Sequence, residues 1–371
     1  MKILLIGGHL TPALAVIDAL PKSAEIVFVG RKSSFEGSKE KSLEYIEMQK
    51  RDIKFYPLTT GRLQRHLSRG FLPSLFKVPK GFAQARKILA FEKPDVVVGF
   101  GGYLSLPVGL TASLLRIPLV LHEQTFQAGL ANKMLSKFAK RICISWESSS
   151  IYFPKQKTVL TGNPLPVIAE KKDGNYFKDA ANLPVLLVTG GSSGSHAINV
   201  LIESALPVLL QEWRVFHQTG DALEYKDFSR LEAYKATMDP QLSRNYEIVK
   251  FVSPDQMEML MSKAKIVVGR SGINTVSQLL RLGKPSLLIP LPNGQSGEQL
   301  LNAQAMQKKG MASILLQKDA TSEKVIEMLD EIVNKYDLFI KNANSAKVMI
   351  REDAASKIVA EIEYVVKEKT S

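Results

Sequence analysis

Short runs of apolar, mostly β-branched residues alternate along this chain with longer segments of helical period. In the first half these runs are nearly continuous, which is typical of parallel strands covered on both faces. Helical stretches such as 12–20 and 130–139 separate them. The alternation predicts a doubly wound parallel sheet. The predicted strands are 2–7, 24–30, 95–100, 118–123, 141–145 and 158–162.

The pattern is interrupted after residue 163 and then starts again. Residues 164–183 are polar and without a period, so they predict a linker. Apolar residues at helical spacing over 354–367 predict a final helix. We therefore expect two α/β domains, at 1–163 and 184–351, with a helical tail at 352–371. The second set of predicted strands is 184–191, 213–220, 246–252, 264–272, 285–291 and 312–316.

Charge and cysteine content narrow the classes of function. The 371 residues carry a formal net charge of +13, which favours an anionic partner. Cys143 is the single cysteine, which excludes an internal disulfide, argues against a cysteine metal site and favours a reducing compartment. No apolar stretch is long enough to span a membrane, so we expect any membrane association to be peripheral. No nucleic-acid-binding motif is recognisable.

The loops after the predicted strands carry the candidate chemistry, because ligands of such sheets bind at the carboxyl ends of strands. In "TGGSSGSHAIN" (189–199), glycines and serines precede a helix, which favours a phosphate over a plain turn. His122 and Glu123 end a buried strand and are candidates for proton transfer. Two further loops offer polar side chains, either to a ligand or as ordinary capping turns: Asn274, Thr275 and Gln278 in one, and Glu298, Gln299 and Asn302 in the other.

Residues 62–93 combine many basic side chains with apolar ones and a single acid, Glu92. Such a composition is typical of a surface that lies on an anionic bilayer. An amphipathic helix that faces the core explains it equally well. The sequence leaves both alternatives open.

Taken together and in order, these motifs resemble the MurG family of glycosyltransferases. The shared motifs are "GGH", "TPALAV", "GFGGYLSLP", "HEQ", "GLANK", "TGNP", "GGSSGSHAIN", "HQTG", "GRSGINTVSQ" and "GEQLLNA". The resemblance implies a GT-B fold, in which two Rossmann-like domains face each other across a cleft and the C-terminal helix returns to the first. It implies inverting transfer of N-acetylglucosamine from UDP-GlcNAc to lipid I at the cytoplasmic face of the membrane, with no cofactor or metal.

The resemblance also implies roles for individual residues. It places the acceptor beside Gly8, His9, Gly102, Tyr103, His122 and Asn132. It places the donor's diphosphate, uracil, ribose and sugar beside Gly191, Ser192, Ser193, Gly194, Phe251, Val252, Arg270, Ser271, Asn274, Thr275, Gln278, Glu298, Gln299 and Asn302. His9 is then the expected general base, since a neutral imidazole suits proton abstraction near pH 7. His122 and Glu123 compete for that role.

The sequence departs from the family pattern at four places. The first loop is "GGH" where the family has GGTGGH, Gln278 replaces a glutamate, Glu298–Gln299 replaces two glutamines, and Pro166 replaces an arginine. These changes keep open a GT-B relative that uses another UDP-sugar or lipid acceptor, an epimerase of UDP-GlcNAc, or a UDP-sugar-binding protein without turnover. A Rossmann oxidoreductase is disfavoured, because "IGGHLTP" lacks the GxGxxG spacing.

Overall fold

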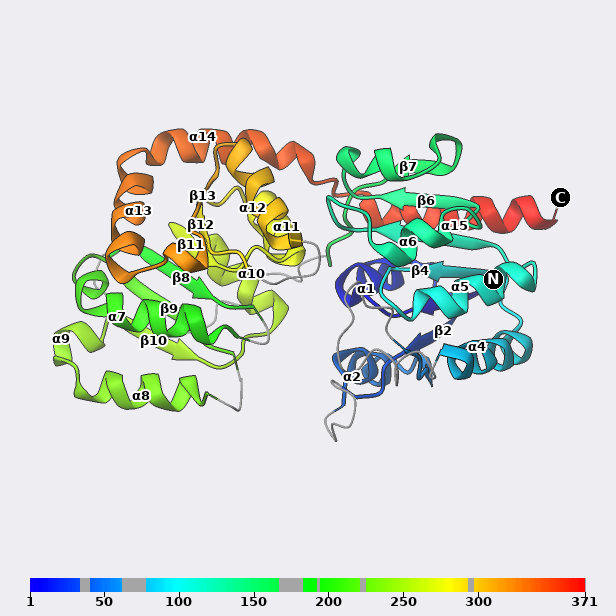
Figure 1. The fold of residues 1–371 in the computed structure, drawn as a ribbon, viewed down its shortest axis with the longest axis horizontal. Helices are drawn as coiled ribbons and strands as arrows, with labels where there is room; N and C mark the ends of the chain where they lie inside the picture. Colours follow the sequence, from blue (N-terminus) through cyan, green and yellow to red (C-terminus); the bar gives the residue numbers. More distant parts are fainter. Residues whose placement is uncertain are drawn as a thin grey trace. The chain divides into compact units, whose positions relative to one another are not determined.

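Two separate parallel sheets organise the chain in the computed structural model (Figure 1). The structure describes residues 1–33, 41–61, 78–166, 183–191, 194–220, 225–292 and 297–370. The chain divides into two compact units, one formed by Met1–Val167 with Arg351–Ser371 and the other by Ile168–Ile350. Most of the predicted linker, 164–183, lies outside the described residues. The two parallel α/β sheets confirm the predicted fold class.

The sheet of the first unit contains seven strands among the described residues, in the order β3-β2-β1-β4-β5-β6-β7, and all neighbours pair in parallel. Its strands are β1 (Lys2–Ile6), β2 (Glu25–Gly30), β3 (Lys54–Pro57), β4 (Val96–Gly99), β5 (Leu119–Glu123), β6 (Arg141–Ile144) and β7 (Thr158–Leu160). Its helices are α1 (Leu10–Ala19), α2 (Leu43–Lys50), α4 (Val78–Glu92), α5 (Ser105–Leu114), α6 (Leu130–Leu135), α15 (Ala354–Thr370) and the short η1 (Glu147–Tyr152) and η2 (Lys155–Lys157).

The sheet of the second unit has the order β10-β9-β8-β11-β12-β13. Its strands are β8 (Val185–Thr189), β9 (Arg214–Gln218), β10 (Tyr246–Val249), β11 (Ile266–Gly269), β12 (Ser286–Leu288) and β13 (Ala312–Ile314). Its helices are α7 (His196–Glu212), α8 (Asp227–Thr237), α9 (Pro240–Ser243), α10 (Pro254–Lys263), α11 (Ile273–Leu282), α12 (Glu298–Lys308), α13 (Ser322–Asn334) and α14 (Tyr336–Ala346), with η4 (Gln317–Asp319) and η5 (Lys347–Met349).

The final helix belongs to the first unit. Figure 1 shows α15, in red, beside the first sheet, and it packs on α1, β4, β5 and β6. Ile358, Val359 and Ile362 on its inner face join the core around Ile3 and Leu5. The predicted helix over 354–367 and its return to the first unit are therefore confirmed.

The described half of the basic and apolar segment, 78–93, forms α4. Ala85, Ile88 and Leu89 on α4 are buried in the first core, whereas Phe91 is 72% exposed. The core-facing alternative therefore accounts for one face of this helix. Residues 62–77 lie outside the described part of the chain.

The strand order of both sheets reverses at one point, between β1 and β4 in the first and between β8 and β11 in the second. Ligands of doubly wound sheets bind at the carboxyl ends of strands beside such a point. The loops that follow these four strands are therefore the places where each unit can hold a ligand.

Candidate active site

The loops after β1 and β4 of the first unit pack backbone against backbone. A Cβ atom on Gly8 would lie 2.2 Å from the carbonyl oxygen of Gly101, and one on Gly102 would lie 3.1 Å from the Cα of Gly8. Gly101 and Gly102 also have positive φ values of 79° and 76°. Only glycine suits such contacts and such dihedral angles. Gly8 and Gly102 therefore shape the loop on which His9 lies.

His9 lies directly before α1 and is half-buried. Its side chain makes no capping hydrogen bond to the helix. A Cβ atom on Gly101 would lie 3.5 Å from Nε2 of His9 and 3.6 Å from Nδ2 of Asn132, so both side chains lie beside this glycine. Burial lowers the pKa of His9 below the ordinary imidazole value, and Glu123 acts in the opposite direction. A neutral imidazole at an accessible turn is suited to accept a proton.

His122 and Glu123 lie at the end of β5, but both are nearly covered, with 1% and 2% of their surface exposed. Nε2 of His122 lies 3.1 Å from the hydroxyl of Ser145. Burial lowers the pKa of His122 to about 3, although a hydrogen bond to the backbone of Gly162 acts in the opposite direction. The imidazole of His122 is therefore a neutral buried group that packs beside the ring of Phe100.

The carboxylate of Glu123 is fully used within the first unit. One oxygen accepts hydrogen bonds from the backbone and hydroxyl of Thr125, and the other accepts from the Gly129 amide and from Nδ2 of Asn132. Gly129 is the N-cap residue directly before α6, so the carboxylate also lies at a helix N-terminus. Four donors to one carboxylate favour a structural task over proton abstraction.

Asn132 connects this carboxylate to the end of β5. Its Nδ2 donates to the carbonyl of His122 and to Glu123, at 3.0 Å each. Its Oδ1 is buried and has no hydrogen-bond partner among the residues that the structure describes. Such an acceptor needs a donor from water or a ligand. Tyr103, the remaining acceptor-side residue from the sequence, is half-buried against the first core.

In the second unit, the glycine loop after β8 folds tightly against the end of β9. A Cβ atom on Gly194 would lie 2.2 Å from the Thr219 carbonyl oxygen, and its φ is 75°. Gly191 has a φ of 84° and its amide donates to the Thr189 hydroxyl. Ser192 and Ser193 lie outside the described residues. The loop leads into the first turn of the 17-residue helix α7, where an anion is stabilised.

Arg270 adds a buried positive charge beside this helix N-terminus. Its guanidinium donates to the Ile289 carbonyl, to Oγ of Ser195 at 2.8 Å and to Oε1 of Gln317 at 2.6 Å. Burial lowers the pKa of Arg270 from its ordinary value. Within the described ranges, Arg270 forms no ion pair with a carboxylate, and Ser195 is the residue that caps α7. The local charge therefore favours an anionic ligand.

Some of the residues that are predicted to contact the ribose and sugar of the donor are accessible, and others are buried. On α11, Asn274 is exposed, whereas Thr275 and Gln278 are half-buried on the same face. Ser271 and Asn302 are fully buried, and Nδ2 of Asn302 donates to the Ser271 carbonyl. The Ser271 hydroxyl donates to the Gln299 carbonyl. These contacts connect the loop after β11 to α12.

The remaining donor-side residues lie nearer to solvent. Glu298 and Gln299 are half-buried at the start of α12. Oε1 of Gln299 accepts from the backbone amide of Leu291. Phe251, which follows the edge strand β10, is 55% exposed and Val252 is half-buried. An exposed aromatic ring beside a ligand-binding edge is suited to stack on a base.

Sequence reasoning missed a buried polar network behind the glycine loop. Asn199 on α7 is fully buried, and its Nδ2 donates to the Thr219 carbonyl and to Asp227. Its Oδ1 lies 3.0 Å from Nε2 of His217, whose Nδ1 lies 2.9 Å from the Tyr246 hydroxyl. The available signal was an asparagine at a position that the helical period places in the core.

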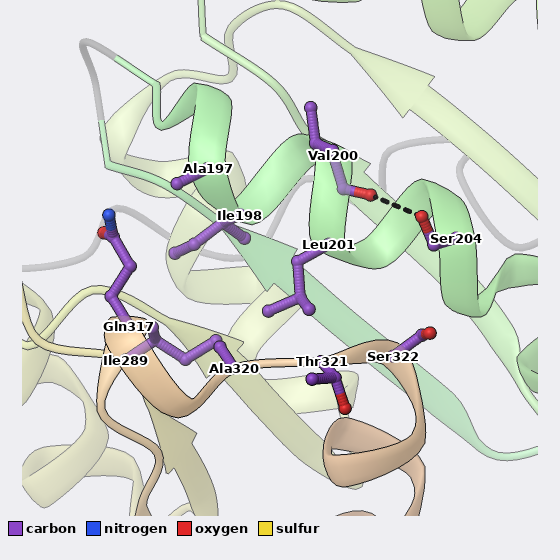
Figure 2. Close-up of a pocket in the computed structure, with 10 residues that line it drawn as sticks. All are labelled: Ala197, Ile198, Val200, Leu201, Ser204, Ile289, Gln317, Ala320, Thr321 and Ser322. Carbon is purple, nitrogen blue, oxygen red and sulfur yellow. Dashed lines mark hydrogen bonds between the residues drawn. The ribbon is translucent and has the colours of Figure 1, made fainter.

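A cavity of about 430 Å³ lies between α7 and the segment that runs from η4 to the start of α13 (Figure 2). Figure 2 shows Ile198 and Leu201 of α7 facing it and Gln317 at one end. The ten residues that line it include no charged side chain. This cavity therefore does not provide the electrostatic environment that a diphosphate needs, and the glycine loop with Arg270 does.

Comparison with known proteins identifies the family. Residues 6–144 match the glycosyltransferase family 28 N-terminal domain, and residues 185–358 match the glycosyltransferase family 28 C-terminal domain. The chain is 33% identical over 363 residues to a UDP-N-acetylglucosamine--N-acetylmuramyl-(pentapeptide) pyrophosphoryl-undecaprenol N-acetylglucosamine transferase of Clostridium botulinum (strain Langeland), covering 94% of this chain and 95% of the relative. The chain belongs to the MurG family.

Other members of the MurG family agree with this assignment over nearly the whole chain. A transferase of the same name from Clostridium novyi is 32% identical over 374 residues, with 98% of both chains covered. The crystal structure of MurG from Acinetobacter baumannii superposes with a TM-score of 0.72 at 26% identity, covering 98% of this chain and 100% of that one. The resemblance stated from the sequence is therefore confirmed.

Proposed function

We propose that this chain transfers N-acetylglucosamine from UDP-GlcNAc to the muramoyl-pentapeptide of lipid I and so forms lipid II, as the names of its relatives describe. It is a hexosyltransferase. The first unit supplies the acceptor-side residues and the second unit supplies the donor-side residues. The single observation that carries the mechanism is the half-buried His9 at the switch point of the first sheet.

In the proposed reaction, His9 removes the proton from the acceptor hydroxyl. The freed oxygen attacks the anomeric carbon of the donor, and the bond from that carbon to the UDP oxygen breaks with inversion. The lowered pKa of His9 keeps its imidazole neutral near pH 7, ready for this proton. Its position on a turn, without a capping bond to α1, leaves the ring available.

The leaving UDP acquires negative charge, which the second unit is suited to stabilise. The N-terminus of α7 has no acidic residue in its first turn, and Arg270 adds a buried positive charge beside the capping residue Ser195. The proposed donor contacts of Asn274, Thr275 and Gln278 lie on the exposed face of α11. This arrangement supplies charge stabilisation from the chain's own groups.

His122 and Glu123 take positioning roles in this mechanism. Each is almost fully buried, and the hydrogen bonds of Glu123 all serve the loop that leads into α6. Glu123 accepts a hydrogen bond from Nδ2 of Asn132 and so holds that side chain beside Gly101, where the ring of His9 also lies. Of the three candidates for the base, His9 is therefore the one whose surroundings suit proton abstraction.

The test is the His9→Ala variant in a transfer assay. We expect turnover to fall about 10²- to 10⁴-fold, which is the usual contribution of a general base. The dissociation constant for UDP-GlcNAc, measured by calorimetry, should stay unchanged, because the proposed donor contacts lie on the second unit. Turnover that survives in His9→Ala would overturn the assignment.

We further propose that the protein associates peripherally with an anionic membrane surface. Within the described ranges, no helix is both long and apolar enough to cross a bilayer. Phe91 lies in the last turn of α4 and Leu114 ends α5, and these two helices pack on each other. The two side chains are 72% and 81% exposed. Lys87, Lys93 and Arg116 lie nearby in the chain and the net charge is +13. Apolar side chains among basic ones support binding to anionic lipid.

A further inference from the structure

Glu44 is a buried acid that the proposed mechanism does not use. It is the second residue of α2 and only 3% exposed. The start of α2 is tied to the end of β2, because the amide of Ser42 donates to the Lys32 carbonyl and its hydroxyl donates to the Arg31 carbonyl. Ser42 also caps the helix by accepting from the Tyr45 amide. The position of Glu44 is thus determined by the first sheet.

The carboxylate of Glu44 lies in a cradle formed by the ends of β1 and β2. Its Oε2 accepts a hydrogen bond from the Arg31 amide at 2.9 Å. A Cβ atom on Gly7 would lie 2.9 Å from Cδ and both oxygens of Glu44, and one on Gly30 would lie 2.7 Å from Oε2. The carboxylate therefore fills space that any side chain at Gly7 or Gly30 would occupy.

This cradle is where a doubly wound sheet ordinarily binds the phosphate of a ligand, at the turn after its first strand. Here the chain supplies the acid itself. Burial raises the pKa of Glu44, while the hydrogen bond from Arg31, its positive charge and the hydrogen bond from Gly8 act in the opposite direction. Gly7 and Gly8 directly precede His9, so the carboxylate lies against the turn that carries the proposed base.

We propose that Glu44 is a positioning residue for the transfer reaction. Its carboxylate occupies the position where a phosphate binds at the first loop of related sheets, and it holds the Gly7–Gly8 turn so that His9 faces the acceptor. The proposal rests on the proposed function.

The experiment uses the full chain with Glu44→Ala and Glu44→Gln. Misplacing a reacting group by about 1 Å costs about 100-fold in rate, so we expect a fall of that order in turnover for Glu44→Ala. The dissociation constant for UDP-GlcNAc should not change. Formate, which fits the vacated cradle, should restore turnover of Glu44→Ala several-fold, whereas the neutral isostere formamide should not. Glu44→Gln keeps one acceptor oxygen and should lose less.

The matched control is Glu92→Gln. Glu92 is also 3% exposed in the first unit, but it bonds to Lys2 and Lys54 next to the amino end of the sheet. Its loss should lower stability and leave turnover unchanged. The proposal would be overturned if turnover is unchanged in Glu44→Ala, or if formamide rescues turnover as well as formate does. It would also be overturned if both variants of Glu44 lose donor binding together with turnover.

A readout independent of turnover separates this proposal from the proposed function. Formate should raise the unfolding temperature of Glu44→Ala and have no effect on the parent chain, because only the variant has a free cradle. If the parent transfers no sugar to lipid I but formate stabilises the variant, the proposed function fails and the anion cradle stands. If the parent transfers sugar and formate neither stabilises nor reactivates the variant, the role of Glu44 fails alone.

Discussion

Replacing Glu123 by glutamine distinguishes a structural carboxylate from a catalytic one. The change keeps the size of the side chain and removes its charge. In the structure, one carboxylate oxygen accepts two hydrogen bonds from Thr125, and the other accepts from Gly129 and Asn132. A glutamine has one oxygen for these donors. Its amide nitrogen then faces two N–H or O–H groups that have lost their acceptor.

The expected cost follows from those contacts. A hydrogen bond to a charged group contributes about 1.5–3 kcal/mol, and two are lost. Asn132 can recover one of them by turning its unpartnered Oδ1 toward the new amide, but its Nδ2 then leaves the His122 carbonyl. We therefore expect the first unit to lose about 3 kcal/mol of its free energy of unfolding.

Trp146 provides the assay for this loss. Its Nε1 donates to the Gln124 carbonyl and its ring stacks on Phe126, so Trp146 packs against the loop that Glu123 organises. The chain has two tryptophans, and Trp213→Phe leaves Trp146 as the only reporter. Urea unfolding followed by its fluorescence measures the first unit. Glu147→Gln, the same chemical change at an exposed position nearby, is the control and should leave the urea midpoint unchanged.

The opposite outcome would refute this reasoning. If Glu123→Gln unfolds at the same urea concentration as the parent and yet loses all turnover, the carboxylate acts on the substrate. Glu123 would then replace His9 as the base.

Two further predictions concern the membrane and pH. The double variant Phe91→Ser, Leu114→Ser should sediment less with vesicles of anionic phosphatidylglycerol than the parent does. Leu338→Ser, at an exposed apolar position on the second unit, should bind as the parent does; equal loss in both would contradict the membrane surface. Burial acts to raise the pKa of Glu92, but its bonds to Lys2, Lys54 and Tyr56 lower it to about 2. Because this folded-state pKa lies below the ordinary value of 4.5, the bonds stabilise the chain above about pH 4.5 and are lost as pH falls toward 2. The stability difference between the parent and Glu92→Gln should therefore be full at pH 7 and vanish near pH 2; a difference that is independent of pH would contradict this.

The parallel sheets were predictable because each buried strand is a local run of apolar residues. The edge strand β3 was missed, since Lys54–Pro57 has exposed ends and only half-buried residues between them. The predicted helix over 130–139 is shorter in the structure, where α6 ends at Leu135. Element boundaries of this kind depend on turns that the period alone does not determine.

The residues of the candidate site were also predictable only in part. That His122 and Glu123 end a buried strand was predictable from the apolar run before them. Their near-complete burial was not, because it depends on α6 and β6, which pack on or pair with β5. Nothing local distinguishes Glu44 from Glu47 on the same helix; only the position of α2 beside Gly7 and Gly30 places the first carboxylate against the turn before His9.

The measurement that tests the central claim most directly is transfer of labelled N-acetylglucosamine from UDP-GlcNAc to a short-chain lipid I analogue by the pure parent protein, without added metal. We expect label in the lipid, with UDP released in equal amount. Binding of UDP-GlcNAc without transfer, or neither binding nor transfer, would contradict it.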